Sequence, residues 1–129
     1  MELVRWEPVR PAPDDDVMFT GSVERKVPTQ EQKTFFGRMR AGWVRFEAGA
    51  RTNWHTHDGE QLLYIIAGRG CVADTDKTIK VGPGDVVHIP VGARHWHGAE
   101  GGEDLLHIAV TGGSQSDWPR PPQVPDPCT

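Results

Sequence analysis

Short apolar runs, interrupted by clusters of Gly, Pro and Asp, repeat along the whole chain. No long stretch places apolar residues at the three-to-four residue period of an amphipathic helix. Fifteen glycines and eleven prolines among 129 residues keep the elements short. The pattern therefore predicts an all-β fold, an antiparallel barrel or sandwich. Its strands are expected at 18–27, 38–47, 53–57, 61–66, 70–74, 78–81, 85–89, 93–97 and 105–110.

The length of 129 residues predicts one domain, and the composition changes towards both ends of the chain. Residues 1–16 hold three prolines and an acidic run, and we interpret them as an N-terminal arm. The barrel is expected to span residues 17–113. Residues 114–129 contain five prolines and few aliphatic side chains, which predicts an extended or disordered tail. Trp118 is expected to anchor the start of this tail on the barrel surface.

The formal net charge is −4, and the basic residues between Arg25 and Arg40 are interrupted by acidic and apolar ones. A continuous basic face of the kind that binds nucleic acid is therefore not expected. No window approaches the 18 apolar residues of a membrane span, and the N-terminus lacks the apolar core of a signal peptide. We expect a soluble, cytoplasmic protein with neither nucleic acid nor a membrane as its partner.

The two cysteines, Cys71 and Cys128, lie in different surroundings, because Cys128 is one residue from the end of the proline-rich tail. A disulfide between them would tie a mobile tail to the barrel. We therefore predict two free thiols and a reducing compartment.

Two His-x-His pairs carry the candidate chemistry, His55 with His57 and His95 with His97. Side chains alternate between the two faces of a strand, so the members of each pair share a face. If that face is the barrel interior, buried imidazoles need partners, and a bound cation would supply one. Gln61 has an odd number, like His55 and His57, and so has the same parity, meaning that its side chain falls on the same face of the chain. We therefore prefer Gln61 as a further ligand.

Glu60 falls on the opposite parity and is expected to point outward or to the rim, although a carboxylate is chemically the stronger ligand. Three imidazoles and one amide oxygen leave positions open on a six-coordinate ion. This donor set suits one divalent first-row transition metal: manganese, iron, nickel, cobalt or zinc. A neutral amide leaves the ion its full charge, which favours Lewis-acid chemistry over redox cycles through a trivalent state.

The sequence around the first pair resembles the first motif of the cupin superfamily, G(x)5HxH(x)3-4E(x)6G. Residues 49–68 fit every spacing from Gly49 to Gly68, with Gln61 in the glutamate position. Around the second pair, residues 84–99 fit the second motif, G(x)5PxG(x)2H(x)3N, with Ala99 in place of the final Asn. The resemblance implies a cupin fold, the double-stranded β-helix or jelly-roll-like antiparallel barrel. The metal ligands that it implies are His55, His57, Gln61 and His95.

Within the superfamily, the chain is most similar to small single-domain cupins, the hydroxynitrile lyases and the relatives of carboxymuconolactone decarboxylase. It departs from the lyases in Asp58-Gly59-Glu60, where they have Pro-Leu-Gly, and in Thr111, where they have a second amide. The substrate therefore does not carry over from this resemblance.

Parity also suggests catalytic candidates beside the metal ligands. His97 shares the face of His95, and we consider it equally as a general acid or base and as a packing or ligand-orienting histidine. His107 lies on the last strand and is a candidate pocket wall or proton carrier. His88 is expected to be structural.

The expected function is a metal-dependent enzyme acting on a small oxygen-containing substrate by lyase, isomerase or decarboxylase chemistry, with a reaction like that of a hydroxynitrile lyase as one form. The alternatives are a metal-dependent dioxygenase and a non-catalytic module that binds a small anion. A face of apolar outer residues predicts a homodimer. These residues are Trp43, Trp54, Tyr64 and Trp96.

Overall fold

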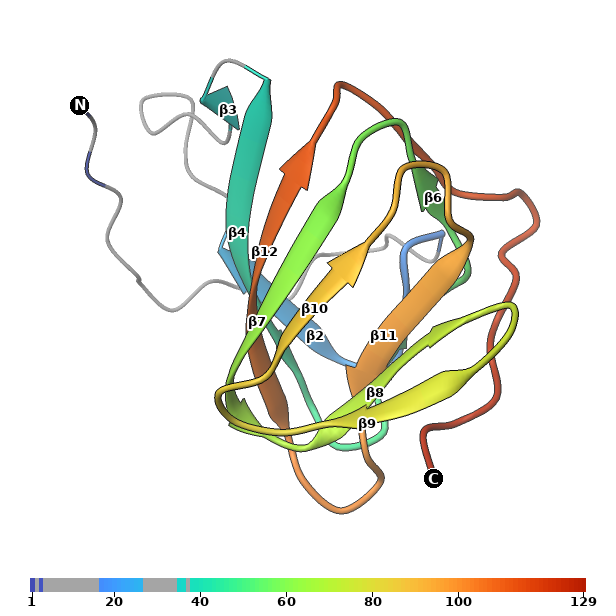
Figure 1. Cartoon of the computed structure of the whole chain (residues 1–129). Coiled ribbons are helices and arrows are strands. Elements are labelled where there is room, and N and C mark those ends of the chain that lie inside the picture. The colour runs from blue at the N-terminus through green and yellow to red at the C-terminus, as the bar shows by residue number, and fades with distance from the viewer. Residues whose placement is uncertain (2, 4–16, 27–34, 37) are drawn as a thin grey trace.

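The computed structural model describes residues 1, 3, 17–26, 35–36 and 38–129, and within these residues every regular element is a β-strand. The all-β prediction is confirmed (Figure 1). No helix in this part of the chain has the length and apolar character needed to span a membrane. The arm predicted at residues 1–16 lies outside the described residues apart from residues 1 and 3. The strands are β1 Phe19–Thr20, β2 Val23–Lys26, β3 Phe35–Phe36, β4 Met39–Phe46, β5 Arg51–Thr52, β6 Thr56–His57, β7 Gln61–Gly68, β8 Gly70–Asp74, β9 Thr78–Val81, β10 Val86–Ile89, β11 His95–Ala99, β12 Leu105–Gly112 and β13 Ser116–Asp117.

Two antiparallel sheets form the body of the described chain (Figure 1). One has the strand order β10-β7-β12-β4-β2, with β3 added beside β4, and the other has the order β1-β5-β11-β8-β9. Strands far apart in the sequence are neighbours in both sheets, as a jelly-roll requires. A separate pair, β13 with β6, connects the C-terminal segment to the barrel.

The alternation expected along the strands is clearest in β7. Gln61, Leu63 and Ile65 are buried, whereas Leu62 and Tyr64 are exposed. The neighbouring strand β12 sets Thr111 opposite Gln61 and His107 opposite Ile65, so polar and apolar inward residues lie side by side. Of the four residues that predicted a homodimer, Tyr64 is exposed on this sheet and Trp96 is buried, and the homodimer stays a prediction.

The apolar core packs between the two sheets and reaches the histidines through one aromatic ring. Phe46 is fully buried, and its ring centroid lies 5.8 Å from that of His97 and 5.3 Å from that of His107. Burial of each such side chain contributes about 1.5–3 kcal/mol to stability. The apolar core thus continues directly into the polar interior. Its other main members are Val23, Leu63, Ile65, Val72, Val81, Ile89 and Leu105.

Gly68, which ends the first motif, shows why that position is a glycine. Its φ is +81°, and a Cβ built there would lie 1.7 Å from the carbonyl oxygen of Asp104. A side chain would therefore collide with the loop before β12 and would also strain the backbone. The motif glycine keeps β7 and the start of β12 in contact.

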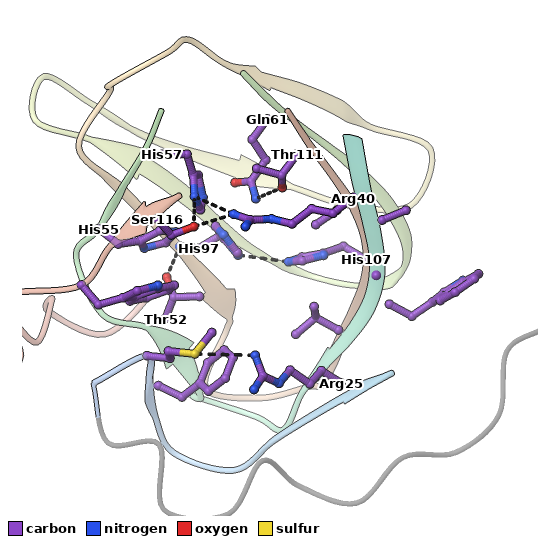
Figure 2. Close-up of a pocket in the computed structure, with 18 residues that line it drawn as sticks. Arg25, Arg40, Thr52, His55, His57, Gln61, His97, His107, Thr111 and Ser116 are labelled. Carbon is purple, nitrogen blue, oxygen red and sulfur yellow. Dashed lines mark hydrogen bonds between the residues drawn. The ribbon is translucent and has the colours of Figure 1, made fainter. Parts of the chain in front are cut away.

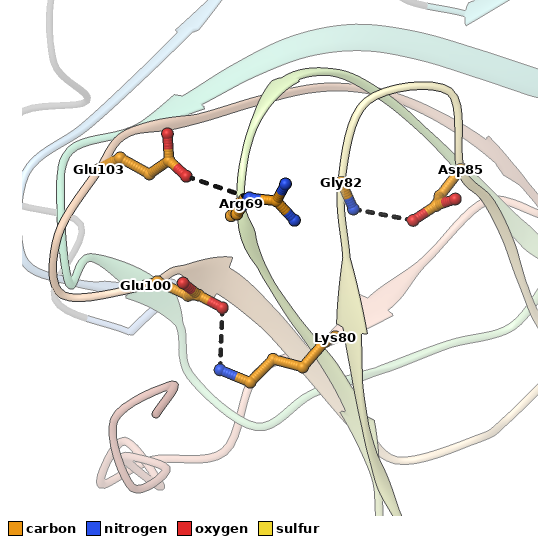
Figure 3. Close-up of polar contacts among 6 residues, drawn as sticks. All are labelled: Arg69, Lys80, Gly82, Asp85, Glu100 and Glu103. Carbon is orange, nitrogen blue, oxygen red and sulfur yellow. Dashed lines mark hydrogen bonds and ion pairs between the residues drawn. The ribbon is translucent and has the colours of Figure 1, made fainter.

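Polar contacts connect the loops at the lower end of the barrel in Figure 1. Lys80 pairs with Glu100 at 2.9 Å, and Arg69 lies 3.7 Å from Glu103 (Figure 3). In the turn before β10, the amide of Gly82 donates to the carboxylate of Asp85. These charges are exposed and partnered, so each pair contributes at most ~1 kcal/mol.

The C-terminal segment, residues 114–129, follows the barrel and is covalently attached to it. Cys71 and Cys128 form a disulfide with a Cα–Cα distance of 5.6 Å, and both residues are buried. The prediction of two free thiols is therefore wrong, and the support that it gave to a reducing compartment is lost. The prediction failed because it treated a segment with few aliphatic residues as undocked.

Backbone hydrogen bonds, which composition does not reveal, hold this segment in place. The amide of Trp54 donates to the carbonyl of Gln123 at 2.9 Å, and Glu100 pairs with Cys128 in a parallel bridge. Trp54 and Trp96 pack around the disulfide. The segment thus covers part of the apolar surface on which the dimer prediction was based.

Candidate metal centre

The two His-x-His pairs converge inside the barrel. His55 forms an antiparallel bridge with His95, with N–O distances of 3.0 and 3.1 Å. One ring nitrogen from each of His55, His95 and His97 lies within 4.8 Å of the others, and all three residues are buried. The ring of His57 is also close, with its centroid 4.8 Å from that of His55 and 5.2 Å from that of His95. Strand alternation has therefore brought four imidazoles to one place.

Backbone carbonyls orient the two bridged histidines. Nδ1 of His55 lies 2.8 Å from the carbonyl oxygen of Asn53, and Nδ1 of His95 lies 2.8 Å from that of Ala93. A carbonyl only accepts, so each Nδ1 carries the proton and each Nε2 keeps its lone pair. This is the arrangement in which a histidine binds a metal through Nε2.

Both ring nitrogens of His95 face oxygen acceptors, but a neutral imidazole has only one N–H to donate. Its Nε2 lies 3.1 Å from Oε1 of Gln61, while its Nδ1 faces the carbonyl of Ala93. Burial lowers the pKa of His95, so at pH 7 the ring is neutral and holds a single proton between two oxygen acceptors. When Nδ1 holds the proton, the lone pair of Nε2 faces a lone pair of Oε1 of Gln61. A cation bound at these two atoms would remove that repulsion, and the donor set therefore fits a metal ion.

The amide of Gln61 is fixed from its other side. Its Nε2 donates to Oγ1 of Thr111 at 2.9 Å, and this bond turns Oε1 towards the histidines (Figure 2). Gln61 is buried, whereas Glu60 is exposed and its carboxylate lies 2.8 Å from Nε2 of His88. The structure thus places Gln61 in the cluster and Glu60 outside it.

His57 is held by side chains instead of a carbonyl. Its Nδ1 lies 2.7 Å from Oγ of Ser116 and 3.3 Å from Nη2 of Arg40. Its Nε2 is buried and, within the described residues, has no hydrogen-bond partner. A buried nitrogen without a partner is costly, and here it lies beside the other candidate ligands.

His97 and His107 form a second, deeper pair. Nδ1 of His97 lies 3.0 Å from Nε2 of His107, and both residues line the cavity. The remaining nitrogens, Nε2 of His97 and Nδ1 of His107, have no partner in the part of the chain that the structure describes. The pair therefore shares one proton between Nδ1 of His97 and Nε2 of His107. Nε2 of His97 remains available to a bound ligand.

The imidazoles are neutral at pH 7. Burial, followed by the nearby His95 and Arg40, lowers the pKa of His57 to about 4. Burial lowers the pKa of His107 to about 4 and moves those of His55 and His97 in the same direction. Protons therefore compete little with a metal for these nitrogens.

Four of these histidines, His55, His57, His97 and His107, line a cavity of about 410 Å³, which is large enough for a small organic molecule. Phe19, Val44 and Trp118 supply apolar wall, and the Trp118 ring stacks on His55 with centroids 3.9 Å apart. Arg25 and Arg40 also line the cavity, and among the described lining residues none is acidic. These walls favour a partly apolar guest that carries or develops negative charge.

Three site residues were not singled out in this role from the sequence. Arg40 has the parity of Val44 and Phe46 on β4, so extending that inward face by two positions would have found it. Ser116 had no local signal, because its contact with His57 arises from the pairing of β13 with β6. Trp118 was expected on the barrel surface, but it lies in the cavity wall.

Comparisons with known proteins agree with this architecture. The cupin domain model matches residues 42–111, more than half of the chain. The chain is 40% identical over 79 residues to (R)-mandelonitrile lyase of Granulicella tundricola, a match that covers 58% of this chain and 60% of that protein. It thus spans less than two thirds of that relative's length.

Solved structures give the same result. A cupin-like protein from Thermotoga maritima superposes with a TM-score of 0.78 at 34% identity, over 88% of this chain and 86% of the other. A predicted oxalate decarboxylase from the same organism has a TM-score of 0.66 at 24% identity, over 84% and 91% of the two chains, which is a likeness of fold alone. With the matched domain, the jelly-roll topology and the converged histidines, this protein belongs to the cupin family.

Proposed function

We propose that this cupin is a metal-dependent enzyme that acts on a small oxygen-containing organic substrate by lyase, isomerase or decarboxylase chemistry. The observation that carries the proposal is His95, whose single proton serves two oxygen acceptors. The similarity to a mandelonitrile lyase supports a lyase of the hydroxynitrile type as the first reaction to test.

His55, His57, Gln61 and His95 would hold one divalent first-row ion, each histidine through Nε2 and Gln61 through Oε1. Such an ion, when bound, supplies a Lewis acid that polarises a substrate oxygen. The chain's own contribution is to keep the three imidazoles neutral and to anchor each Nδ1, so that the nitrogens need not reorganise. Thr111 does the same for the amide.

His97 would move the proton. When its Nδ1–H donates to Nε2 of His107, Nε2 of His97 is a base that can accept a proton from the substrate. When Nε2–H of His107 donates instead, Nε2 of His97 carries a proton and is an acid. The pair can thus take a proton at one stage of a reaction and return it at another. The ring of Phe46 packs against both imidazoles of this pair.

A second candidate is a non-catalytic module that binds a small anion. The two arginines and the lack of acidic side chains among the described lining residues favour this alternative. A dioxygenase that uses three histidines and iron is a further possibility with no separate observation in its favour.

Elemental analysis of protein purified without added metal, followed by a substrate panel, tests the proposal. The panel contains cyanohydrins, catechols, hydroxyketones and acidic sugars, with oxygen uptake measured alongside. Bound first-row metal and turnover of one class without oxygen uptake are expected. Saturable binding with no turnover would favour the anion-binding module, and oxygen uptake with a catechol would favour the dioxygenase. A protein that takes up no divalent ion even when metal is supplied would overturn the proposal.

A further inference from the structure

The C-terminal segment enters the candidate metal centre. Strand β13 pairs with β6 so that Ser116 lies opposite His57, and Trp118 stacks on His55 two residues later. A segment outside both cupin motifs therefore contacts two of the four proposed metal ligands.

Ser116 lies between two different partners. Its Oγ accepts a hydrogen bond from Nη2 of Arg40 and lies 2.7 Å from Nδ1 of His57 (Figure 2). A hydroxyl has two acceptor positions and one hydrogen, so Oγ can accept from Arg40 and either accept from Nδ1–H of His57 or donate to an unprotonated Nδ1. The guanidinium of Arg40 has only donors.

This difference determines which tautomers of His57 the site can accommodate, because Ser116 can partner Nδ1 with or without its proton, whereas Arg40 can partner only an unprotonated Nδ1. To bind a metal through Nε2, the ring must carry its proton on Nδ1, and that proton needs an acceptor. Ser116 supplies the acceptor. Without its oxygen, Nδ1 faces the N–H of Arg40 at 3.3 Å, which favours an unprotonated Nδ1 and a proton on Nε2. A proton on Nε2 blocks the position at which the metal would bind.

The segment is held at both ends, which keeps Ser116 in place. Next to the site, the carboxylate of Asp58 accepts from the amides of Ser114 and Gln115. At the far end, the Cys71–Cys128 disulfide ties the segment to β8.

We propose that the C-terminal segment is a working part of the metal centre, in which Ser116 is a positioning residue that supplies the hydrogen-bond acceptor needed by the metal-binding tautomer of His57. The inference rests on the proposed metal-dependent function and adds the residue that prepares one of its ligands. It assigns to a proline-rich tail a role that the two cupin motifs do not contain.

The test compares two variants of equal shape, Ser116→Thr, which keeps a hydroxyl, and Ser116→Val, which does not. Affinity for Zn²⁺ is measured by competition with a chromophoric chelator. We expect Ser116→Val to lose ~10–100-fold in affinity and Ser116→Thr to stay within about threefold of the wild type. The control is Ser114→Ala, since Ser114 is in the same segment but its hydroxyl bonds Asp58 and not a histidine.

A second readout needs no metal. Nitrogen-15 NMR of the histidine rings in the metal-free protein reports which nitrogen of His57 carries the proton. We expect Ser116→Val to shift His57 towards the Nε2–H form and Ser116→Thr to leave it unchanged. If Ser116→Val weakens the fold, the other two variants still test the proposal. Ser116→Thr and Ser114→Ala must both keep the wild-type tautomer of His57.

The outcomes separate the two proposals. A wild-type protein that binds Zn²⁺, with Ser116→Val binding equally well and with an unchanged His57 tautomer, overturns the role of Ser116 alone. Equal losses in Ser116→Val, Ser116→Thr and Ser114→Ala also overturn it, because the effect would then belong to the segment's packing and not to the hydroxyl. A wild-type protein that binds no divalent ion overturns the proposed function and this inference with it.

Discussion

Two regions that build the candidate site are specified in different ways. The barrel supplies His55, His57, Gln61 and His95, and the alternation of its strands turns these donors inward. The C-terminal segment supplies Ser116 and Trp118, which contact the donors from outside the barrel pattern. The difference teaches that the chemistry of this site is encoded by strand parity, whereas part of its support depends on long-range attachment.

The largest effect should separate the roles within the barrel. His57→Ala removes a proposed ligand and should lower metal content, whereas His97→Ala should leave metal content intact and cut turnover by ~100-fold or more. Elemental analysis and steady-state kinetics on the same preparations measure the two effects.

The geometry gives this comparison an alternative outcome, because the tightest histidine group contains His97 beside His55 and His95. If His97→Ala loses its metal while His57→Ala keeps it, His97 is a metal ligand and His57 is the candidate for proton transfer. Full turnover in His97→Ala with metal retained would remove His97 from proton transfer.

The disulfide tests how far the barrel depends on the C-terminal segment. A double variant, Cys71→Ala with Cys128→Ala, opens a loop of 57 residues and should lower the free energy of unfolding by about 4 kcal/mol. Urea unfolding measures this loss. The stack on His55 should also loosen, which tryptophan fluorescence of Trp118 would report. An unchanged unfolding midpoint would mean that the backbone bonds of the segment suffice to hold it.

Acid should lower the free energy of unfolding, because the buried histidines are neutral in the folded protein and gain protons when it unfolds. Burial lowers the pKa of His107 to about 4 in the folded chain, against about 6.5 when unfolded. The unfolded state therefore binds more protons between these values, so the stability present above pH 6.5 is lost as pH falls towards 4. For His107 the loss is about 3 kcal/mol. Thermal unfolding of metal-free protein across this range should show it, and His107→Gln should reduce the slope of the profile, with the rest contributed by the other buried histidines. A wild-type profile that is already flat would contradict the assignment of neutral buried histidines.

The all-β class and the inward faces of the histidine pairs could be predicted from local periodicity, whereas the cupin topology and the proposed ligand set came from the resemblance to the two cupin motifs. The alternation that buries Gln61, Leu63 and Ile65 is visible in the residues themselves, and the His-x-His spacing fixes the shared face. The expected strand at 53–57 is interrupted in the structure, with β5 and β6 on either side of the bridge at His55, yet the inward parity survives.

The C-terminal segment could not be predicted in this way, because no local pattern shows where a chain returns. Ser116 reaches His57 across 59 residues, and Cys128 reaches Cys71 across 57. Its docking uses backbone hydrogen bonds, a stacked tryptophan and a disulfide, none of which requires aliphatic composition. Proline content led to the prediction of an extended or disordered tail and gave no sign of this attachment.

The smallest expected effect concerns the choice between Glu60 and Gln61 as the residue whose side-chain oxygen binds the metal. Glu60→Gln removes the charge from the exposed contact with His88, which should change stability by less than ~1 kcal/mol and leave metal affinity unchanged. Gln61→Ala removes a buried amide next to His95 and should weaken metal binding ~10-fold or more, because it deletes a ligand that Thr111 holds in place. Chelator competition on the two variants measures this contrast. If Glu60→Gln weakened binding and Gln61→Ala did not, the carboxylate would have to turn inward when metal binds, and parity would have chosen the wrong residue.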